Sequence, residues 1–361
     1  MHIVVAPDSF KGTASATEAA AGIANGIRQH YPNATVTTLP MADGGEGTAQ
    51  VLAQAAAAGG QETQTITLPT TDAMGRLTEA QYFLAGHTAF IDVAAATGLP
   101  AVRAALDPLH ADSYGTGVLL ADAQSRGATS IVLGLGGTAS IDGGMGILAA
   151  LGAAAHDKRG YALPKGGAPL VQLHSIDTAQ LNIKAGMVDF TLLADTRAMA
   201  MQAATMYGPQ KGAEGEQVAL LAGALLQMCK VTGTDPETEF TGAAGGIPIG
   251  LTWLSRTLWG TDEHARVVSG GTHVAKALGL AEAISQADLV ITGEGAFDEQ
   301  SLTGKVVGTV ADLAAETSTP VGIIAGAINQ DTEHFTAELD QEGGMPEQLA
   351  RAARDIVKQL G

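Results

Sequence analysis

Three loops in this sequence place carboxylates, lysine or serine next to glycine, directly after a short apolar run. The first loop contains Asp8, Ser9, Lys11 and Gly12. A lysine in such a loop can neutralise a transferring phosphoryl group, and a carboxylate can bind a metal ion or accept a proton. The same residues are compatible with an ordinary solvated turn, so this loop by itself leaves both interpretations open.

The second loop carries two carboxylates, Asp43 and Glu46, among the glycines 44, 45 and 47. Carboxylates at this spacing can share one hard cation or bind a polyol. Alternatively, Asp43 caps the following helix and Glu46 lies in its first turn. The spacing does not favour one interpretation over the other.

The third loop contains Gly293, Glu294 and Gly295, followed by Asp298 and by Gly304-Lys305 at a predicted helix start. It again offers paired carboxylates and a lysine. It is not a Walker A loop, because valine follows Gly304-Lys305 and glutamate occupies the position of the first glycine. Any nucleotide site here is therefore of another type.

A fourth, glycine-rich segment runs from Gly134 to Gly144. Gly134, Gly136 and Ala139 fit the spacing of a dinucleotide-binding fingerprint. The helix predicted at 145–151 begins too late to place its N-terminus on a pyrophosphate at Gly136. The segment therefore favours a loop around the phosphates of a mononucleotide, with Asp142 as a possible metal ligand.

The elements that must position these loops repeat at the two ends of the chain. Strand, loop, helix and strand are predicted over residues 3–39 and again over 288–325, an order that implies a parallel sheet. Between them, runs 63–69, 77–84 and 88–94 indicate adjacent strands and a mixed sheet. We predict an α/β protein with a flavodoxin/Rossmann-like parallel-sheet domain (1–65 and 286–361) and an inserted α/β domain (66–285).

Composition excludes several classes of protein. With 37 acidic and 19 basic residues, the net charge of −18 disfavours binding to nucleic acid or anionic lipid. A single cysteine, Cys229, permits no internal disulfide, and the nine histidines show no zinc-ligand spacing. The N-terminus is predicted to be a strand and not a signal peptide, and no run of about 18 apolar residues exists. We expect a cytoplasmic protein with no membrane span.

Taken together, the loops closely resemble the bacterial glycerate kinase family whose members form 2-phosphoglycerate. The resemblance runs in order along nearly the whole chain and is carried by the motifs at 6–12, 42–48, 114–117, 135–144, 208–213, 242–246 and 291–305. It implies a two-domain α/β kinase with its active site in the cleft between the domains. It also implies ATP and a divalent metal ion, Mg²⁺, as cofactors and D-glycerate as the acceptor.

On these loops we assign candidate roles. The candidate catalytic residues are Asp8, Lys11, Asp43 and Lys305. The candidate ATP-binding residues are Ser9, Gly136, Gly137, Thr138, Lys211, Gly293, Glu294 and Gly295. The candidate metal ligands are Asp195, Asp298 and Glu294. Transfer would be direct and in line, with Asp8 or Asp43 accepting the hydroxyl proton.

Two departures from the family pattern affect the acceptor. The residues after Asp195 are Thr196 to Ala200, and Ala296 stands where the family usually has a basic residue. A different small hydroxy or sugar acid is therefore an alternative substrate, unless Arg197 supplies the missing cation. A metabolite-binding regulatory protein without catalysis and a dinucleotide oxidoreductase are further alternatives. The oligomeric state, monomer or homodimer, stays open.

Overall fold

A computed structural model describes residues 1–302 and 305–360. The chain forms two compact units, one made of Met1–Asp43 with Ser269–Gly361 and the other of Gly44–Val268. Both divisions fall earlier than the expected boundaries at 65/66 and 285/286. The reason is local packing: α2 (Thr48–Ala58) contacts strands of the second unit, whereas α11 (Gly270–Ala277) and α12 (Leu280–Ser285) contact a helix of the first.

The first unit is built on a five-stranded parallel sheet in the order β13-β12-β11-β1-β2. Its strands are β1 (His2–Val5), β2 (Thr35–Thr38), β11 (Leu289–Glu294), β12 (Val321–Ala325) and β13 (Phe335–Glu338). Side chains alternate between the two faces. Ile3, Val5 and Ile291 belong to a core that also includes residues of α1 (Ala16–His30) and α14 (Met345–Leu360). The helix α13 (Val306–Thr317) contacts β11 and β12.

Helix α1 begins with a capping box. The Ser15 hydroxyl accepts from the Glu18 amide at 3.2 Å, and the Glu18 carboxylate accepts from the Ser15 amide at 2.9 Å. The helix then packs closely on α14, because a Cβ placed on Gly26 would lie 2.4 Å from the Cα of Ala350. Glycine is therefore required for this approach of the two helices.

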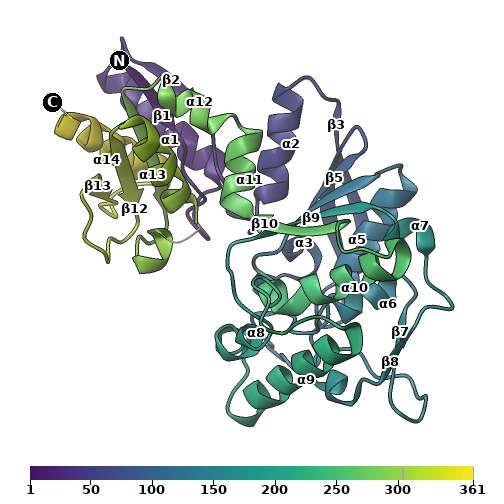
Figure 1. The fold of residues 1–361 in the computed structure, drawn as a ribbon. Coiled ribbons are helices and arrows are strands. Elements are labelled where there is room, and N and C mark those ends of the chain that lie inside the picture. The colour runs from purple at the N-terminus through teal and green to yellow at the C-terminus, as the bar shows by residue number, and fades with distance from the viewer. Residues whose placement is uncertain (303–304, 361) are drawn as a thin grey trace. The chain divides into compact units, whose positions relative to one another are not determined.

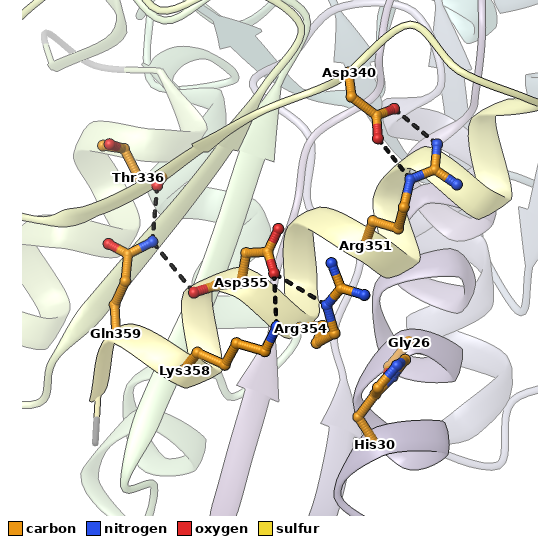
Figure 2. A network of polar contacts seen from close by, with 9 residues as sticks. All are labelled: Gly26, His30, Thr336, Asp340, Arg351, Arg354, Asp355, Lys358 and Gln359. Atoms are coloured by element: carbon orange, nitrogen blue, oxygen red, sulfur yellow. Dashed lines mark hydrogen bonds and ion pairs between the residues drawn. The ribbon is translucent and has the colours of Figure 1, made fainter.

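Polar contacts fasten α14 along its length (Figure 2). Arg351 binds the Asp340 carboxylate with two nitrogens, at 2.5 and 2.7 Å. Further along, Asp355 accepts from Arg354 and Lys358, and the Gln359 side chain reaches the carbonyl of Thr336 at 3.1 Å. These contacts are largely exposed and contribute to register more than to stability.

The second unit is built on a six-stranded mixed sheet in the order β10-β9-β6-β5-β4-β3. Antiparallel pairs join β3 (Thr63–Thr71), β4 (Leu77–Ala85) and β5 (Thr88–Asp92). Parallel pairs join β5, β6 (Ser130–Gly134) and β9 (Asp189–Ala194), and β10 (Ala265–Ser269) forms the edge. The predicted α/β fold, with one parallel and one mixed sheet, is thus confirmed.

Helices and a small second sheet complete this unit (Figure 1). The helices after α2 are α3 (Ala94–Thr97), α4 (Leu99–Val102), α5 (Tyr114–Ser125), α6 (Met145–Ala150), α7 (Ile183–Gly186), α8 (Gln202–Thr205), α9 (Glu216–Thr232) and α10 (Ile247–Trp259). Strands β7 (Ala154–His156) and β8 (Ser175–Asp177) form an antiparallel pair. Among the described residues, no helix has the length and apolar character needed to cross a bilayer.

Candidate active site

In the first unit, the loops after three neighbouring parallel strands meet at one edge of the sheet. The amide of Asp8, after β1, donates to the carbonyl of Gly293, in β11, at 2.8 Å. The amide of Met41, after β2, donates to the carbonyl of Pro7 at 2.8 Å. Three of the candidate carboxylates of this unit, Asp8, Asp43 and Glu294, therefore come together, as expected for strand ends in an open α/β sheet.

Asp8 lies at the centre of this carboxylate cluster. Its side chain is 9% exposed, and its Oδ1 accepts from the amide of Ser9 at 2.6 Å. Burial, and next the negative charge of Asp43, raise the pKa of Asp8 to about 8, with a smaller contribution from Glu294. The Ser9 amide and the positive charge of Lys11 act in the opposite direction. Asp8 is therefore poised to exchange a proton near neutral pH.

Glu294 ends β11 and is also buried. Its Oε1 atom has no hydrogen-bond partner among the residues that the structure describes. Burial raises the pKa of Glu294, whereas a hydrogen bond from Ser301 and the charge of Lys305 lower it. A buried acceptor without a donor is costly, so Glu294 is the residue of this cluster that most needs a ligand, a cation or a proton.

Two lysines flank the carboxylates. Lys11 is exposed, and its backbone nitrogen lies 3.8 Å from the position of a Cβ on Gly295, so the first and third loops are side by side. Lys305 immediately precedes α13 and acts electrostatically on Glu294. The structure thus brings together Asp8, Lys11, Asp43 and Lys305, the four residues that the sequence analysis assigns to catalysis. Gly304 lies outside the described residues.

Asp298 has a local structural task in the third loop. Its Oδ1 accepts from the amides of Gln300 at 2.9 Å and Ser301 at 3.3 Å, and so caps the short turn η4 (Glu299–Leu302). Asp298 can therefore bind a metal ion only while it also caps this turn. Within the described residues, no three His, Cys, Asp or Glu side chains form a group that could hold a metal ion by themselves.

The second unit holds the glycine-rich segment at the ends of β5, β6 and β9. The amide of Gly136 donates to the carbonyl of Gly44 at 2.8 Å, so it is not available to a phosphate. The Thr138 hydroxyl is buried and lies 3.2 Å from the Ser140 hydroxyl. Gly137 is exposed and has a φ of 78°. Of the three predicted phosphate-binding residues in this segment, Gly137 is therefore the one that presents its backbone to solvent.

Lys211 supports this segment from inside. Its Nζ donates to the carbonyl of Ser140 at 2.8 Å, and its side chain is 4% exposed. Burial lowers the pKa of Lys211 to about 8, against the charges of Asp142 and Asp195. Direct contact with a nucleotide, as the sequence analysis expects, is disfavoured by this burial.

The Asp142 carboxylate is likewise occupied by hydrogen bonds within the protein. Its Oδ2 accepts from the Ser113 amide and hydroxyl, both at 2.8 Å, and from the Gly146 amide at 2.9 Å. Its Oδ1 accepts from the Gly144 amide at 3.2 Å. The bonds to the Gly144 and Gly146 amides satisfy the start of α6, and the bonds to Ser113 occupy Asp142 further, so it is not a free metal ligand.

The positions that depart from the family pattern differ in exposure: Ala198 and Ala200 are buried, whereas Arg197, Met199 and Ala296 are exposed. Arg197 is exposed, and its Nη1 lies 3.4 Å from Oε2 of Glu239. Ala296 is exposed in the third loop of the first unit. Arg197 belongs to the second unit, so the two departures lie in different units.

Sequence reasoning missed the role of Asp92. This buried residue ends β5 and accepts from the amides of Gly47 and Ala49, each at 2.9 Å. The sequence offers Asp43 as the cap of α2, but Asp92, far away in the sequence, supplies it. The available signal was an acidic residue at the carboxyl end of a predicted buried strand.

Comparison with known proteins agrees with this arrangement. Residues 3–354 match the model of the glycerate kinase family. A glycerate kinase of Halalkalibacterium halodurans is 36% identical, over 92% of this chain and 87% of that protein. A glycerate 2-kinase of Escherichia coli K12 is 37% identical, over 92% of this chain and 86% of that protein.

A solved structure agrees over the full length. The crystal structure of a protein assigned as glycerate kinase 2 from Salmonella typhimurium LT2 is 34% identical, covers 100% of this chain and 98% of its own, and superposes with a TM-score of 0.80. The resemblance noted in the loops therefore holds across both units, and the chain belongs to the glycerate kinase family.

Proposed function

We propose that this phosphotransferase moves the γ-phosphoryl group of ATP to D-glycerate and forms 2-phospho-D-glycerate. The observation that carries the proposal is the meeting of Asp8, Asp43 and Glu294 with two lysines at one edge of the parallel sheet. Phosphoryl transfer needs positioning and neutralisation of charge more than covalent participation by the protein. Carboxylates and lysines at a strand end can supply both.

Within this proposal, Asp8 accepts the proton of the attacking hydroxyl. Its pKa of about 8 supports this assignment, because a base is most effective when its pKa is near the working pH. The proton goes to the carboxylate oxygen of Asp8 as the hydroxyl oxygen bonds to the γ-phosphorus. The bond between that phosphorus and the β–γ bridging oxygen breaks, and ADP leaves with that oxygen. Lys11 offsets negative charge on the transferring group, and Lys305 offsets charge beside Glu294.

The oxygen donors of the site fit Mg²⁺. Glu294 offers a buried oxygen without a partner among the described residues, and Mg²⁺ prefers carboxylate oxygen completed by substrate phosphates and water. We assign Glu294 and Asp298 as the residues of the first unit that would hold it. Asp195 of the second unit stays a separate candidate ligand. Bound Mg²⁺ would neutralise charge on the phosphate oxygens of ATP.

The glycine-rich segment is proposed to contact ATP phosphate through Gly137. Ser9, Gly293 and Gly295 keep their assignment to nucleotide binding in the first unit. Lys211 acts indirectly, because its ammonium group holds the carbonyl of Ser140. The use of ATP and the buried state of the single thiol, Cys229, are in keeping with a cytoplasmic protein.

A direct test combines ATP, Mg²⁺ and D-glycerate and identifies the product by ¹³C and ³¹P NMR. In the proton-coupled ³¹P spectrum, a doublet from the single proton on C2 supports the proposal, and splitting by the two protons on C3 would correct the product to 3-phosphoglycerate. The exposed Ala296 and the exposed Arg197–Glu239 pair favour a second candidate, a kinase of another small hydroxy acid. ADP release with tartronate or a sugar acid but not with glycerate would establish that candidate instead.

A further inference from the structure

Helix α2 begins without a cap from its own sequence. Its N-cap residue, Gly47, has a φ of 92° and no side chain to accept a hydrogen bond, and its first turn contains no acidic residue. The first amides of a helix lack partners within the helix and must be satisfied from elsewhere. This helix follows the loop that contains Asp43, so its start determines where that loop ends.

Asp92 satisfies this helix from the end of β5. Its Oδ2 accepts from the Gly47 amide and its Oδ1 from the Ala49 amide, both at 2.9 Å. The carboxylate is 8% exposed. The surroundings are fitted to it, since a Cβ on Gly134 would lie 2.7 Å from Oδ1. Two backbone bonds to one buried carboxylate fix both position and orientation.

Residues at the ends of β6 and β9 hold the beginning of the turn 44–47. The Gly44 carbonyl accepts from the Gly136 amide at 2.8 Å, and the Gly44 amide donates to the Thr48 hydroxyl at 3.2 Å. A Cβ on Gly44 would lie 2.6 Å from the carbonyl oxygen of Leu193, so the turn is pressed against β9 as well. The turn 44–47 is thus held at both ends, and Asp43 is the residue directly before it.

From this arrangement we infer that Asp92 is a positioning residue for phosphoryl transfer. It fixes the turn 44–47, the backbone that continues directly from Asp43. The inference rests on the proposed function, in which Asp43 belongs to the reacting site. Asp92 touches neither substrate in this scheme and acts only through the backbone that it holds.

The test uses the full chain with Asp92→Asn and Asp92→Ser. Asparagine keeps the size of the side chain but can accept only one of the two hydrogen bonds from the backbone amides. Serine is smaller than aspartate, so it introduces no steric overlap. We expect kcat with ATP and D-glycerate to fall by about tenfold to a hundredfold, since small displacements of reacting groups cost that much. Hydrogen exchange measured by mass spectrometry should accelerate in the peptide that covers residues 44–51.

Asp72→Asn is a control in the same unit. Asp72 is a buried carboxylate whose Oδ1 accepts from the amides of Met74 at 2.9 Å and Arg76 at 3.0 Å, and whose Oδ2 accepts from Nε of Arg76 at 2.6 Å. Asparagine weakens the contact with the Arg76 side chain, so the variant should lower the midpoint of thermal unfolding while leaving kcat within about twofold of the wild type.

The inference is overturned if both Asp92 variants keep wild-type kcat, or if Asp72→Asn lowers kcat equally. Unchanged hydrogen exchange over residues 44–51 would also overturn it. If Asp92→Asn fails to fold, the same two measurements on Asp92→Ser decide. If the wild-type protein transfers no phosphoryl group to glycerate, the proposed function is wrong. The hydrogen-exchange experiment then still reports whether Asp92 holds the turn 44–47.

Discussion

Replacing Asp8 by asparagine should stabilise the first unit and stop the reaction at the same time. Asparagine keeps the shape of the side chain and can still accept from the Ser9 amide, but it cannot ionise. In the wild type, ionised Asp8 is disfavoured by burial and by the charges of Asp43 and Glu294. The variant removes that unfavourable charge together with the proposed proton acceptor.

The pH dependence follows from the pKa of Asp8, which is about 8 in the folded protein and 3.8 as the ordinary value. The folded state therefore binds more protons than the unfolded state between these limits. The contribution of Asp8 to stability is fully present below about pH 4 and is lost as the pH rises to 8. One carboxyl group can change the free energy of unfolding by up to about 1.4 kcal/mol per pH unit in this window.

Between pH 5 and pH 7 the stability of Asp8→Asn relative to the wild type should thus rise by at most about 2.7 kcal/mol. The raised pKa of Asp8 depends partly on the charge of Asp43, so we expect a rise of about 1.5–2.5 kcal/mol. Urea unfolding curves at both pH values, in EDTA to exclude bound metal, measure the difference. The comparison of variant and wild type cancels the titration of the remaining groups.

Asp331→Asn is the control, because Asp331 is an exposed carboxylate of the same unit. The difference in free energy of unfolding between Asp331→Asn and the wild type should be the same at both pH values. The reasoning is refuted if the difference between Asp8→Asn and wild type stays constant within about 0.5 kcal/mol from pH 5 to pH 7. Turnover with ATP and glycerate that matches the wild type would separately remove Asp8 from the reaction.

Three further predictions concern the flanking lysine, the helix contact and the buried lysine. Lys11→Ala should lower kcat by at least about a hundredfold through lost charge stabilisation, and Lys11→Arg should recover part of it; near-normal kcat in Lys11→Ala rejects its role. Gly26→Ala should destabilise the protein by about 1–3 kcal/mol in urea unfolding, because the new methyl group overlaps the backbone of Ala350; equal stability would show that α1 and α14 can separate freely. Lys211 has a pKa of about 8 against the ordinary 10.5, so the unfolded state binds more protons between these values. The wild type should therefore gain stability relative to Lys211→Met as the pH rises from 8 to 10, and a loss over that range contradicts the burial argument.

The sequence predicts the local elements of this fold well, because their signals are local. The capping box at Ser15 and Glu18 starts α1, and the Ala-rich run between glycine loops gives α2 at Thr48–Ala58. The short apolar runs give β1, β11 and β12 within one or two residues. The grouping of Asp8, Asp43 and Glu294 also follows from the sequence, because loops after adjacent parallel strands must meet at one edge.

The sequence does not predict which groups are already occupied by the protein. A glycine-rich run suggests that backbone amides are available to a ligand. In the structure, the Gly136 amide donates to the carbonyl of Gly44, and the Asp142 carboxylate accepts from amides at the start of α6. The cap of α2 comes from Asp92 because β5 and β6 bring that carboxylate to the turn, which no local pattern encodes. The unit boundary after Asp43 was missed for the same reason, since it depends on which sheet α2 packs against.

The interrupted first unit has a consequence for how the chain is made. Residues 44–268 form one continuous unit, so everything that it needs has been synthesised before β11 exists. Domains commonly fold in the order in which they leave the ribosome. Strands β1 and β2 remain without β11 and α14 until residues 289–360 have been synthesised, so Asp8 and Asp43 are the first residues of the carboxylate cluster to be synthesised and Glu294 is the last. A chain released before β11 would therefore carry a folded middle and no assembled carboxylate cluster.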